Sequence, residues 1–148
     1  GGFVIRHKSH SGKEVSDNLA TANVLAKNQG DAVVLREVRE ARDRRNPDTY
    51  VNGQVAEFKG IKTENLNTAI NNNVHRARRQ GVSEVYLHLP KAFRSDKVKK
   101  GLQTAFYNDR NADITKVHLV FGEKVVTIER SNYELGTIRE AFKEGLKQ

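Results

Sequence analysis

Two carboxylates and a lysine lie close together in the middle of the chain: Asp48, Glu57 and Lys59. Between the carboxylates stands Asn52-Gly53, flanked on both sides by β-prone residues. Asn-Gly in this setting is the preferred centre of a two-residue type I′ hairpin, because both turn positions need a positive φ. Counting outward from this turn places Asp48 directly opposite Glu57 on the neighbouring strand.

This arrangement is suited to hydrolysis of phosphodiesters. Directly opposed residues have Cβ atoms about 4.5–5.5 Å apart, so the two carboxylates repel unless something offsets their charge. Mg²⁺ does so naturally, since it favours one or two carboxylates together with water and substrate phosphate. Strand alternation puts Lys59 on the face of Glu57, where its ammonium group can orient a water or stabilise the transition state. We therefore expect Asp48 and Glu57 to bind Mg²⁺ or Mn²⁺. The alternative is that Glu57 and Lys59 form an ordinary exposed strand face.

The pattern of apolar residues predicts the elements that position these side chains. A first helix begins with Ser11 as its cap, has Glu14 in a capping box and ends at Gly30, and a buried strand covers 32–38. The hairpin of residues 49–59 comes next, followed by a helix over 64–80 and a half-buried strand over 85–89, whose exposed face carries Glu84, Tyr86 and His88.

The C-terminal part continues this alternation of helices and strands. Ser95 caps a third helix, and a second hairpin runs from Val117 to Glu129. Ser131 opens a final helix with an apolar stripe of Leu135, Ile138, Phe142 and Leu146. The predicted fold class is α/β with a mixed sheet, in the order α-β-β-β-α-β-α-β-β-α.

Length and composition narrow the functional classes. The chain has 148 residues, no cysteine and a formal charge of +8. It is long enough for one core, so we expect a single domain over residues 1–148 that contains no disulfide and no thiolate metal site. No apolar run reaches the roughly 20 residues that span a bilayer. The charge favours a nucleic-acid partner, because each Lys or Arg that neutralises a phosphate releases counterions; a basic domain without such a partner is the alternative.

The N-terminal residues indicate that this chain is a piece of a longer protein. The sequence begins Gly1-Gly2 and contains no methionine. We expect residues 1–10 to be a tag remnant and flexible arm, and any export signal to lie outside this chain.

The central motif resembles a known signature. Pro47-Asp48, eight intervening residues and Glu57-Phe58-Lys59 are similar to the PD-(D/E)XK pattern of restriction-endonuclease-like nucleases. The order α-β-β-β-α-β over residues 12–89 is similar to the common core of that superfamily. The early helix, the Asn-Pro-Asp, the Asn-Gly hairpin and the Glu-Phe-Lys together resemble C-terminal toxin domains of contact-dependent growth inhibition and related polymorphic toxin systems. This likeness covers about residues 7–90.

The resemblance implies a bacterial toxin nuclease that acts on tRNA or, in other members, on DNA. Such a domain is delivered into competing cells as part of a larger secreted or cell-surface protein, acts in the target-cell cytoplasm, and is neutralised by a cognate immunity protein. By analogy, Asp48 and Glu57 are metal ligands and Lys59 is the catalytic lysine. An acidic residue of the first helix often joins such a site, and Glu14 is the candidate here; its other role is that of capping-box partner.

Further residues are candidates for substrate binding or for a different mechanism. Polar residues on and before the second helix are suited to following a phosphate backbone, with a solvated helix face as the alternative; they are Lys62, Thr63, Asn71, His75, Arg78 and Arg79. His75, His88 and His118 have no ligand spacing, and we assign them no metal.

Two other functional hypotheses remain open. A metal-independent ribonuclease of the barnase, colicin or RelE-like fold would use His7 or His10 for acid-base chemistry. A basic nucleic-acid-binding module without catalysis would bind its polymer and leave it intact.

Overall fold

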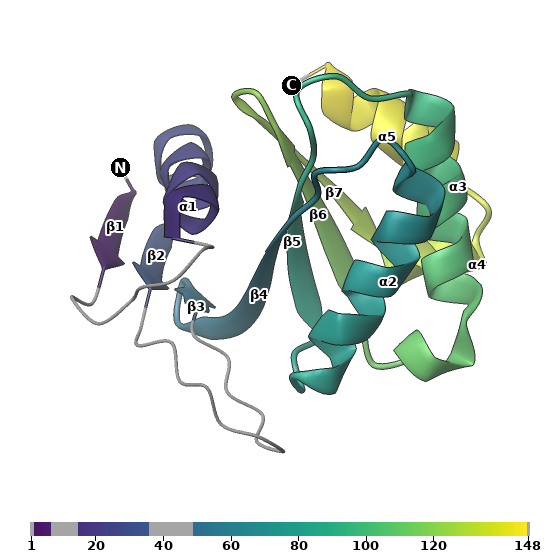
Figure 1. The fold of residues 1–148 in the computed structure, drawn as a ribbon, viewed down its shortest axis with the longest axis horizontal. Helices are drawn as coiled ribbons and strands as arrows, with labels where there is room; N and C mark the ends of the chain where they lie inside the picture. The colour runs from purple at the N-terminus through teal and green to yellow at the C-terminus, as the bar shows by residue number, and fades with distance from the viewer. Residues whose placement is uncertain (1, 7–14, 36–48, 148) are drawn as a thin grey trace.

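A computed structural model describes residues 2–6, 15–35 and 49–147 as a seven-stranded sheet with helices on both faces (Figure 1). In chain order the elements are β1 (Phe3–Arg6), α1 (Val15–Gln29), β2 (Ala32–Leu35), β3 (Thr49–Val51), β4 (Gln54–Gly60), α2 (Leu66–Arg79), β5 (Glu84–His88), α3 (Ser95–Tyr107), the short 3₁₀ turn η1 (Asp109–Asn111), β6 (Lys116–Phe121), β7 (Lys124–Glu129), α4 (Arg130–Glu134) and α5 (Ile138–Leu146).

The strands lie in the sheet in the same order as in the chain. β1 and β2 are parallel, as are β4, β5 and β6, and the other neighbours are antiparallel. Parallel neighbours need a crossover connection, which α2 and α3 provide for β4-β5 and β5-β6. The predicted mixed α/β class is confirmed, and so is the order α1-β2-β3-β4-α2-β5.

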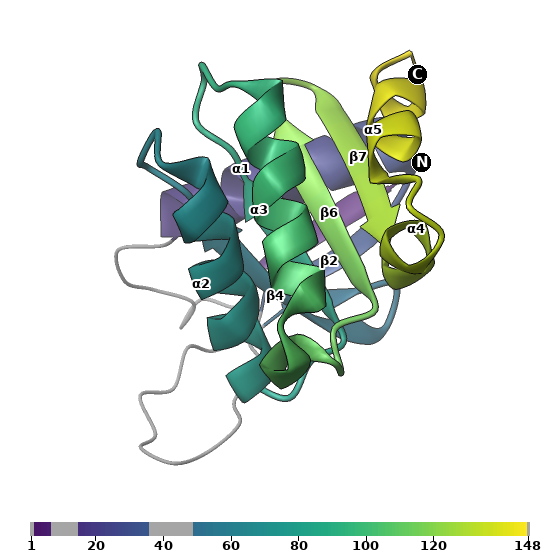
Figure 2. The ribbon, with the colours of Figure 1, turned by 90° about the vertical axis from the view of Figure 1, so that its right-hand side faces the viewer.

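Each face of the sheet has its own apolar core. Below α1 the core contains Ala22 and Leu25 from the helix, packed with Val33, Phe58 and Tyr86 from the sheet. On the opposite face lie α2, α3 and α5, and Figure 2 shows α2 and α3 side by side in front of the sheet. The predicted stripe of α2 is confirmed, because every member is buried; it comprises Leu66, Ala69, Ile70, Val74 and Ala77.

The interior strand β5 differs from its predicted half-buried state. Tyr86 was expected on an exposed face, yet it is 5 % exposed. Its ring stacks on His118 with centroids 4.1 Å apart and meets the Phe58 ring edge-on at 5.2 Å. The cause is topological, since a strand with parallel neighbours on both sides is covered on both faces.

The N-terminal prediction is corrected in part. Residues 1–10 were expected to be a flexible arm, but Phe3–Arg6 forms β1 and pairs in parallel with β2. The run Phe-Val-Ile has high β-propensity. This signal was overlooked because the run directly follows Gly1-Gly2, which was interpreted as a tag remnant.

The C-terminal prediction of one long helix is also wrong. Two short helices replace it, and Gly136, with φ of 71°, stands between them. Leu135, expected in the apolar stripe, is 76 % exposed, whereas Ile138 and Phe142 are buried as predicted. Ser131 does not cap α4, because the capping box joins Glu129 and Asn132. Ser95 is likewise the first residue of α3 and not its cap.

Candidate active site

The β3-β4 hairpin has the predicted turn and register. Asn52 and Gly53 have φ of 52° and 84°, and Val51, Tyr50 and Thr49 face Gln54, Val55 and Ala56. The Asn52 side chain fastens the turn to the rest of the sheet: its Oδ1 accepts the Ala32 N–H at 2.8 Å, and its Nδ2 donates to Asp31 Oδ1 at 2.9 Å. Asp48 follows next in this register but lies outside the described residues, so its pairing with Glu57 stays a prediction.

Glu57 and Lys59 share one face of β4, as strand alternation predicts. Ala56 and Phe58 belong to the core below α1, while Lys59 Nζ lies 3.7 Å from Glu57 Oε1 on the other side of the strand. The side chains of Glu57 and Lys59 are only 10 % and 20 % exposed. The alternative of an ordinary exposed strand face therefore does not describe this pair.

The burial of this ion pair changes both its energetic cost and the strength of its charges. Removing a carboxylate or an ammonium group from water costs several kcal/mol, and proximity of the opposite charge offsets part of that cost. Charges that are shielded from water act more strongly on a nearby substrate than the same charges on an open surface. Glu57 and Lys59 thus form an ion pair on the sheet that is largely shielded from water.

The structure describes only some of the residues that were predicted to bind a metal ion. Among residues 2–6, 15–35 and 49–147 no cluster of three or more His, Asp or Glu side chains is arranged to hold a metal ion. Glu57 is the one predicted ligand in these ranges, and its carboxylate is the hard oxygen donor that Mg²⁺ prefers. Asp48 and Glu14 lie outside them. A Mg²⁺ site formed by Glu57 and Asp48 therefore stays a prediction.

Lys62 and Thr63 lie beyond the end of β4. Lys62 Nζ donates to Asp17 Oδ1 of α1 at 2.9 Å, and Thr63 Oγ1 accepts the Asn65 N–H at 3.2 Å. Thr63 therefore stabilises the turn into α2. The Lys62 side chain is 76 % exposed, and its binding of a phosphate stays a prediction.

The residues of α2 that were predicted to bind substrate contact residues in and just after η1, and not residues of β4. Asn71 Oδ1 accepts from Asn111 Nδ2 at 3.4 Å, and Arg78 Nε lies 3.8 Å from Asp113 Oδ2. Arg79 is exposed, and His75 is half-buried with no hydrogen-bond partner for Nδ1 among the described residues. None of these contacts connects the α2 residues to the Glu57–Lys59 pair.

Three further histidines, His7, His10 and His118, differ in what the structure describes of them. His7 and His10 lie outside the described residues. His118 is buried and bonds Glu84 Oε1 at 2.9 Å and Thr127 Oγ1 at 2.7 Å. The hydrogen bond from His118 holds the pKa of Glu84 below its ordinary value, against the opposing effect of burial. This network links β5, β6 and β7 and stabilises the sheet.

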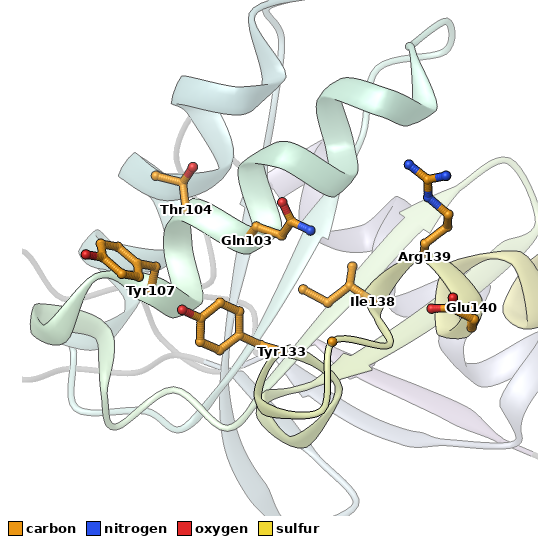
Figure 3. Close-up of a pocket in the computed structure, with 8 residues that line it drawn as sticks. Gln103, Thr104, Tyr107, Tyr133, Ile138, Arg139 and Glu140 are labelled. Atoms are coloured by element: carbon orange, nitrogen blue, oxygen red, sulfur yellow. The ribbon is translucent and has the colours of Figure 1, made fainter.

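Two pockets lie away from the Glu57–Lys59 pair. The larger, about 590 Å³, lies between α3 and the α4-α5 segment (Figure 3), with Tyr107 and Tyr133 toward one end and Arg139 and Glu140 toward the other. It contains no predicted site residue.

The smaller pocket, about 330 Å³, lies where β4 and β5 end and is lined by Asp17, Lys62, His88 and Lys91, among others. Of these, only Lys62 was predicted as a site residue. The others were missed because they are spread over the chain without a motif, and the position of Asp17 in the first turn of a helix is a common and uninformative one.

Comparisons with known proteins identify a similar fold. No family model and no curated protein matches the sequence. One chain of a solved structure, described as the CdiA-CT/CdiI toxin and immunity complex from Burkholderia pseudomallei, is similar with a TM-score of 0.59. The match covers 87 % of this chain and 99 % of the other at 16 % sequence identity.

This similarity concerns the fold. At such low identity the alignment does not carry over individual residues, so the Glu57–Lys59 pair rests on its own geometry. The described helices are also too short or too polar for any of them to cross a membrane.

Proposed function

We propose that this chain is a metal-dependent nuclease and the toxin domain of a contact-dependent growth inhibition system. The observation that carries the nuclease proposal is the largely buried pair of Glu57 and Lys59, 3.7 Å apart on one face of β4. The predicted position of Asp48 opposite Glu57 adds the second carboxylate. The net charge of +8 is the electrostatic property expected of a protein that binds a polyanion.

Each residue has a definite role in this proposal. Glu57 and Asp48 would hold a divalent cation, which when bound would polarise the phosphate and lower the pKa of an attacking water. Lys59 directs its ammonium group at the scissile phosphate and stabilises the negative charge that develops there. Glu57 also fixes Lys59, because their ion pair restricts a side chain that otherwise samples many rotamers.

The toxin part of the proposal is supported by the fold. The similar structure is that of a toxin and immunity complex, and the early helix, Asn-Gly hairpin and Glu-Phe-Lys motif resemble toxin domains of such systems. We infer a substrate of tRNA in preference to DNA, a cognate immunity protein as partner, and delivery into the cytoplasm of a competing cell by a larger protein. Glu14 is retained as a candidate third acidic residue.

A substrate panel tests this function. Purified protein is incubated with total tRNA and with plasmid, each with Mg²⁺, Mn²⁺ or excess chelator. We expect cleavage of tRNA with metal and loss of cleavage with chelator. Cleavage that persists in chelator would favour a metal-independent ribonuclease that uses His7 or His10. Tight, salt-sensitive binding without cleavage under every condition would favour a non-catalytic module.

The immunity partner is tested with the product of a neighbouring gene. We expect co-expression to abolish the toxicity of the wild-type chain and to protect tRNA in extracts. Toxicity that a Glu57→Gln variant retains in full would contradict the nuclease assignment, whether or not the neighbouring protein binds.

A further inference from the structure

The pocket at the ends of β4 and β5 lies at a favourable position for a ligand. In open α/β sheets, ligands bind outside the carboxyl ends of parallel strands. Here Gly60 and His88 are the last residues of two such strands and pair with each other. The volume of about 330 Å³ lies at the lower end of the range for small-ligand pockets, about 300–1,000 Å³.

A carboxylate and an ammonium group are held together in this pocket. Asp17 Oδ1 accepts from Lys62 Nζ at 2.9 Å, and the Asp17 side chain is 32 % exposed. The strand end allows this approach only because residue 60 is glycine, since a Cβ there would lie 2.9 Å from Asp17 Oδ2. Asp17 therefore presents its carboxylate directly over the end of β4.

A histidine forms another wall of the pocket. His88 Nδ1 and Thr21 Oγ1 are 2.9 Å apart, which fixes the ring and leaves Nε2 as its remaining polar atom. Burial lowers the pKa of His88, an effect that Asp17 opposes and Lys62 reinforces. This shift favours the neutral ring, so the two lysines of the pocket supply its positive charge.

We propose that this pocket binds one ribose-phosphate unit of an RNA strand, with Lys62 and Lys91 on the phosphate and Asp17 accepting a hydrogen bond from the 2′-hydroxyl. The lining contains a carboxylate that can accept a hydrogen bond from a hydroxyl group and two ammonium groups that can bind a phosphate. A ribose-phosphate unit requires this combination. A phosphate alone would leave the Asp17 carboxylate opposing its ligand. DNA would provide the phosphate but no 2′-hydroxyl, and the 2′-hydroxyl is the group by which proteins distinguish RNA from DNA.

This proposal rests on the proposed function, because it gives the nuclease a means to select RNA. The pocket and the Glu57–Lys59 pair are nevertheless separate. Gly60 opens toward Asp17 of α1, whereas Glu57 and Lys59 lie on the opposite face of β4. Binding at the pocket can therefore be measured in a protein in which Glu57 of the proposed catalytic pair has been substituted.

The test uses the Glu57→Gln protein with fluorescently labelled single strands of one sequence, made as RNA and as DNA. Fluorescence anisotropy gives the two dissociation constants. We expect RNA to bind about 10-fold more tightly, the amount that one hydrogen bond to a charged group provides. Equal affinity for the two strands would overturn the proposal without bearing on cleavage, which is measured separately in the Glu57-intact protein.

Variants of the pocket separate the roles of its residues. Asp17→Ala should remove the preference for RNA, and Gly60→Ala should reduce it by displacing the Asp17 carboxylate while leaving that residue in place. If Asp17 only neutralised Lys62, Asp17→Ala would instead strengthen RNA and DNA binding equally, which would overturn the assignment.

Lys62→Ala should weaken the binding of both strands about 3- to 10-fold and lower the salt dependence by about one counterion. Lys27→Ala is the matched control. It removes another exposed lysine that is paired with a carboxylate, Glu123, at 3.6 Å. An equal loss in the Lys27→Ala and Lys62→Ala proteins would mean that only net charge matters, and this would also overturn the proposal.

Discussion

Lys59 Nζ lies 3.7 Å from Glu57 Oε1, two residues away along β4 and on the same face of the sheet. Both side chains are largely shielded from water, and the hairpin that presents them is fixed by the left-handed turn at Asn52-Gly53. A local turn thus determines which face of the strand carries the acid and the base.

The hairpin turn depends on Asn52 in two ways that substitution can separate. Asn52→Gly keeps the positive φ and loses the side-chain bonds to Ala32 and Asp31, whereas Asn52→Ala loses the bonds and also strains the backbone. We expect urea denaturation to show a loss of about 1 kcal/mol for Asn52→Gly and about 2–3 kcal/mol for Asn52→Ala. Equal losses would mean that the left-handed conformation carries no strain.

Acid should destabilise the protein partly through Glu84. Its folded pKa lies below its ordinary 4.5, chiefly because of the hydrogen bond with His118. Its contribution to stability is therefore complete above about pH 4.5 and is lost as the pH falls through the folded pKa. We expect the urea midpoint of wild type to fall more steeply than that of Glu84→Gln below about pH 5.

The control for this comparison is Glu123→Gln, which removes an exposed carboxylate 3.6 Å from Lys27. Its pH profile should follow that of wild type. A Glu84→Gln profile parallel to wild type would show that the His118 bond does not favour the ionised form.

Two glycines that both lack room for a methyl group should respond differently to alanine. At Gly60 the added Cβ meets the end of the Asp17 side chain, which can rotate away. At Gly101 it meets Leu66 O at 3.0 Å and Asn67 Cα at 3.1 Å, where α2 and α3 are in contact. We expect Gly101→Ala to cost about 1–3 kcal/mol and Gly60→Ala much less, as measured by thermal unfolding. A larger loss for Gly60→Ala would contradict this description of the strand end.

The break at Gly136 predicts unequal roles for two apolar residues of the C-terminal segment. Leu135 is 76 % exposed and Phe142 is 1 % exposed. Leu135→Ser should change the free energy of unfolding by about 0.5 kcal/mol or less, and Phe142→Ala should cost about 3–5 kcal/mol. Similar large losses for both would support the single continuous helix predicted from the sequence.

Local signals predicted much of the fold. Asn52-Gly53 gave the hairpin register, and the spacing of Leu66, Ile70 and Val74 gave the buried face of α2, because turn geometry and helical period are properties of neighbouring residues. The same-face placement of Glu57 and Lys59 followed from strand alternation alone.

Properties that depend on the assembled sheet were not predicted. Tyr86 was assigned to an exposed face because the pattern of one strand does not reveal that both of its faces are covered. Asp17, Thr21 and His88 meet only because α1 crosses the ends of β4 and β5, and no spacing in the sequence indicates that contact. Gly136 was read as part of a helix because the apolar period continues across it.

The metal dependence of the cleavage rate in three proteins tests the central claim most directly. Initial rates on the cleaved polymer are measured over a range of Mg²⁺ concentrations for wild type, Glu57→Gln and Lys59→Ala, with Glu123→Gln as a matched control and circular dichroism to verify folding. We predict that Glu57→Gln needs more Mg²⁺ for half-maximal rate, and that Lys59→Ala loses at least about 100-fold at saturating Mg²⁺ with an unchanged Mg²⁺ requirement. Wild-type rates and an unaltered Mg²⁺ requirement in both variants would contradict the assignment of this pair as the catalytic site.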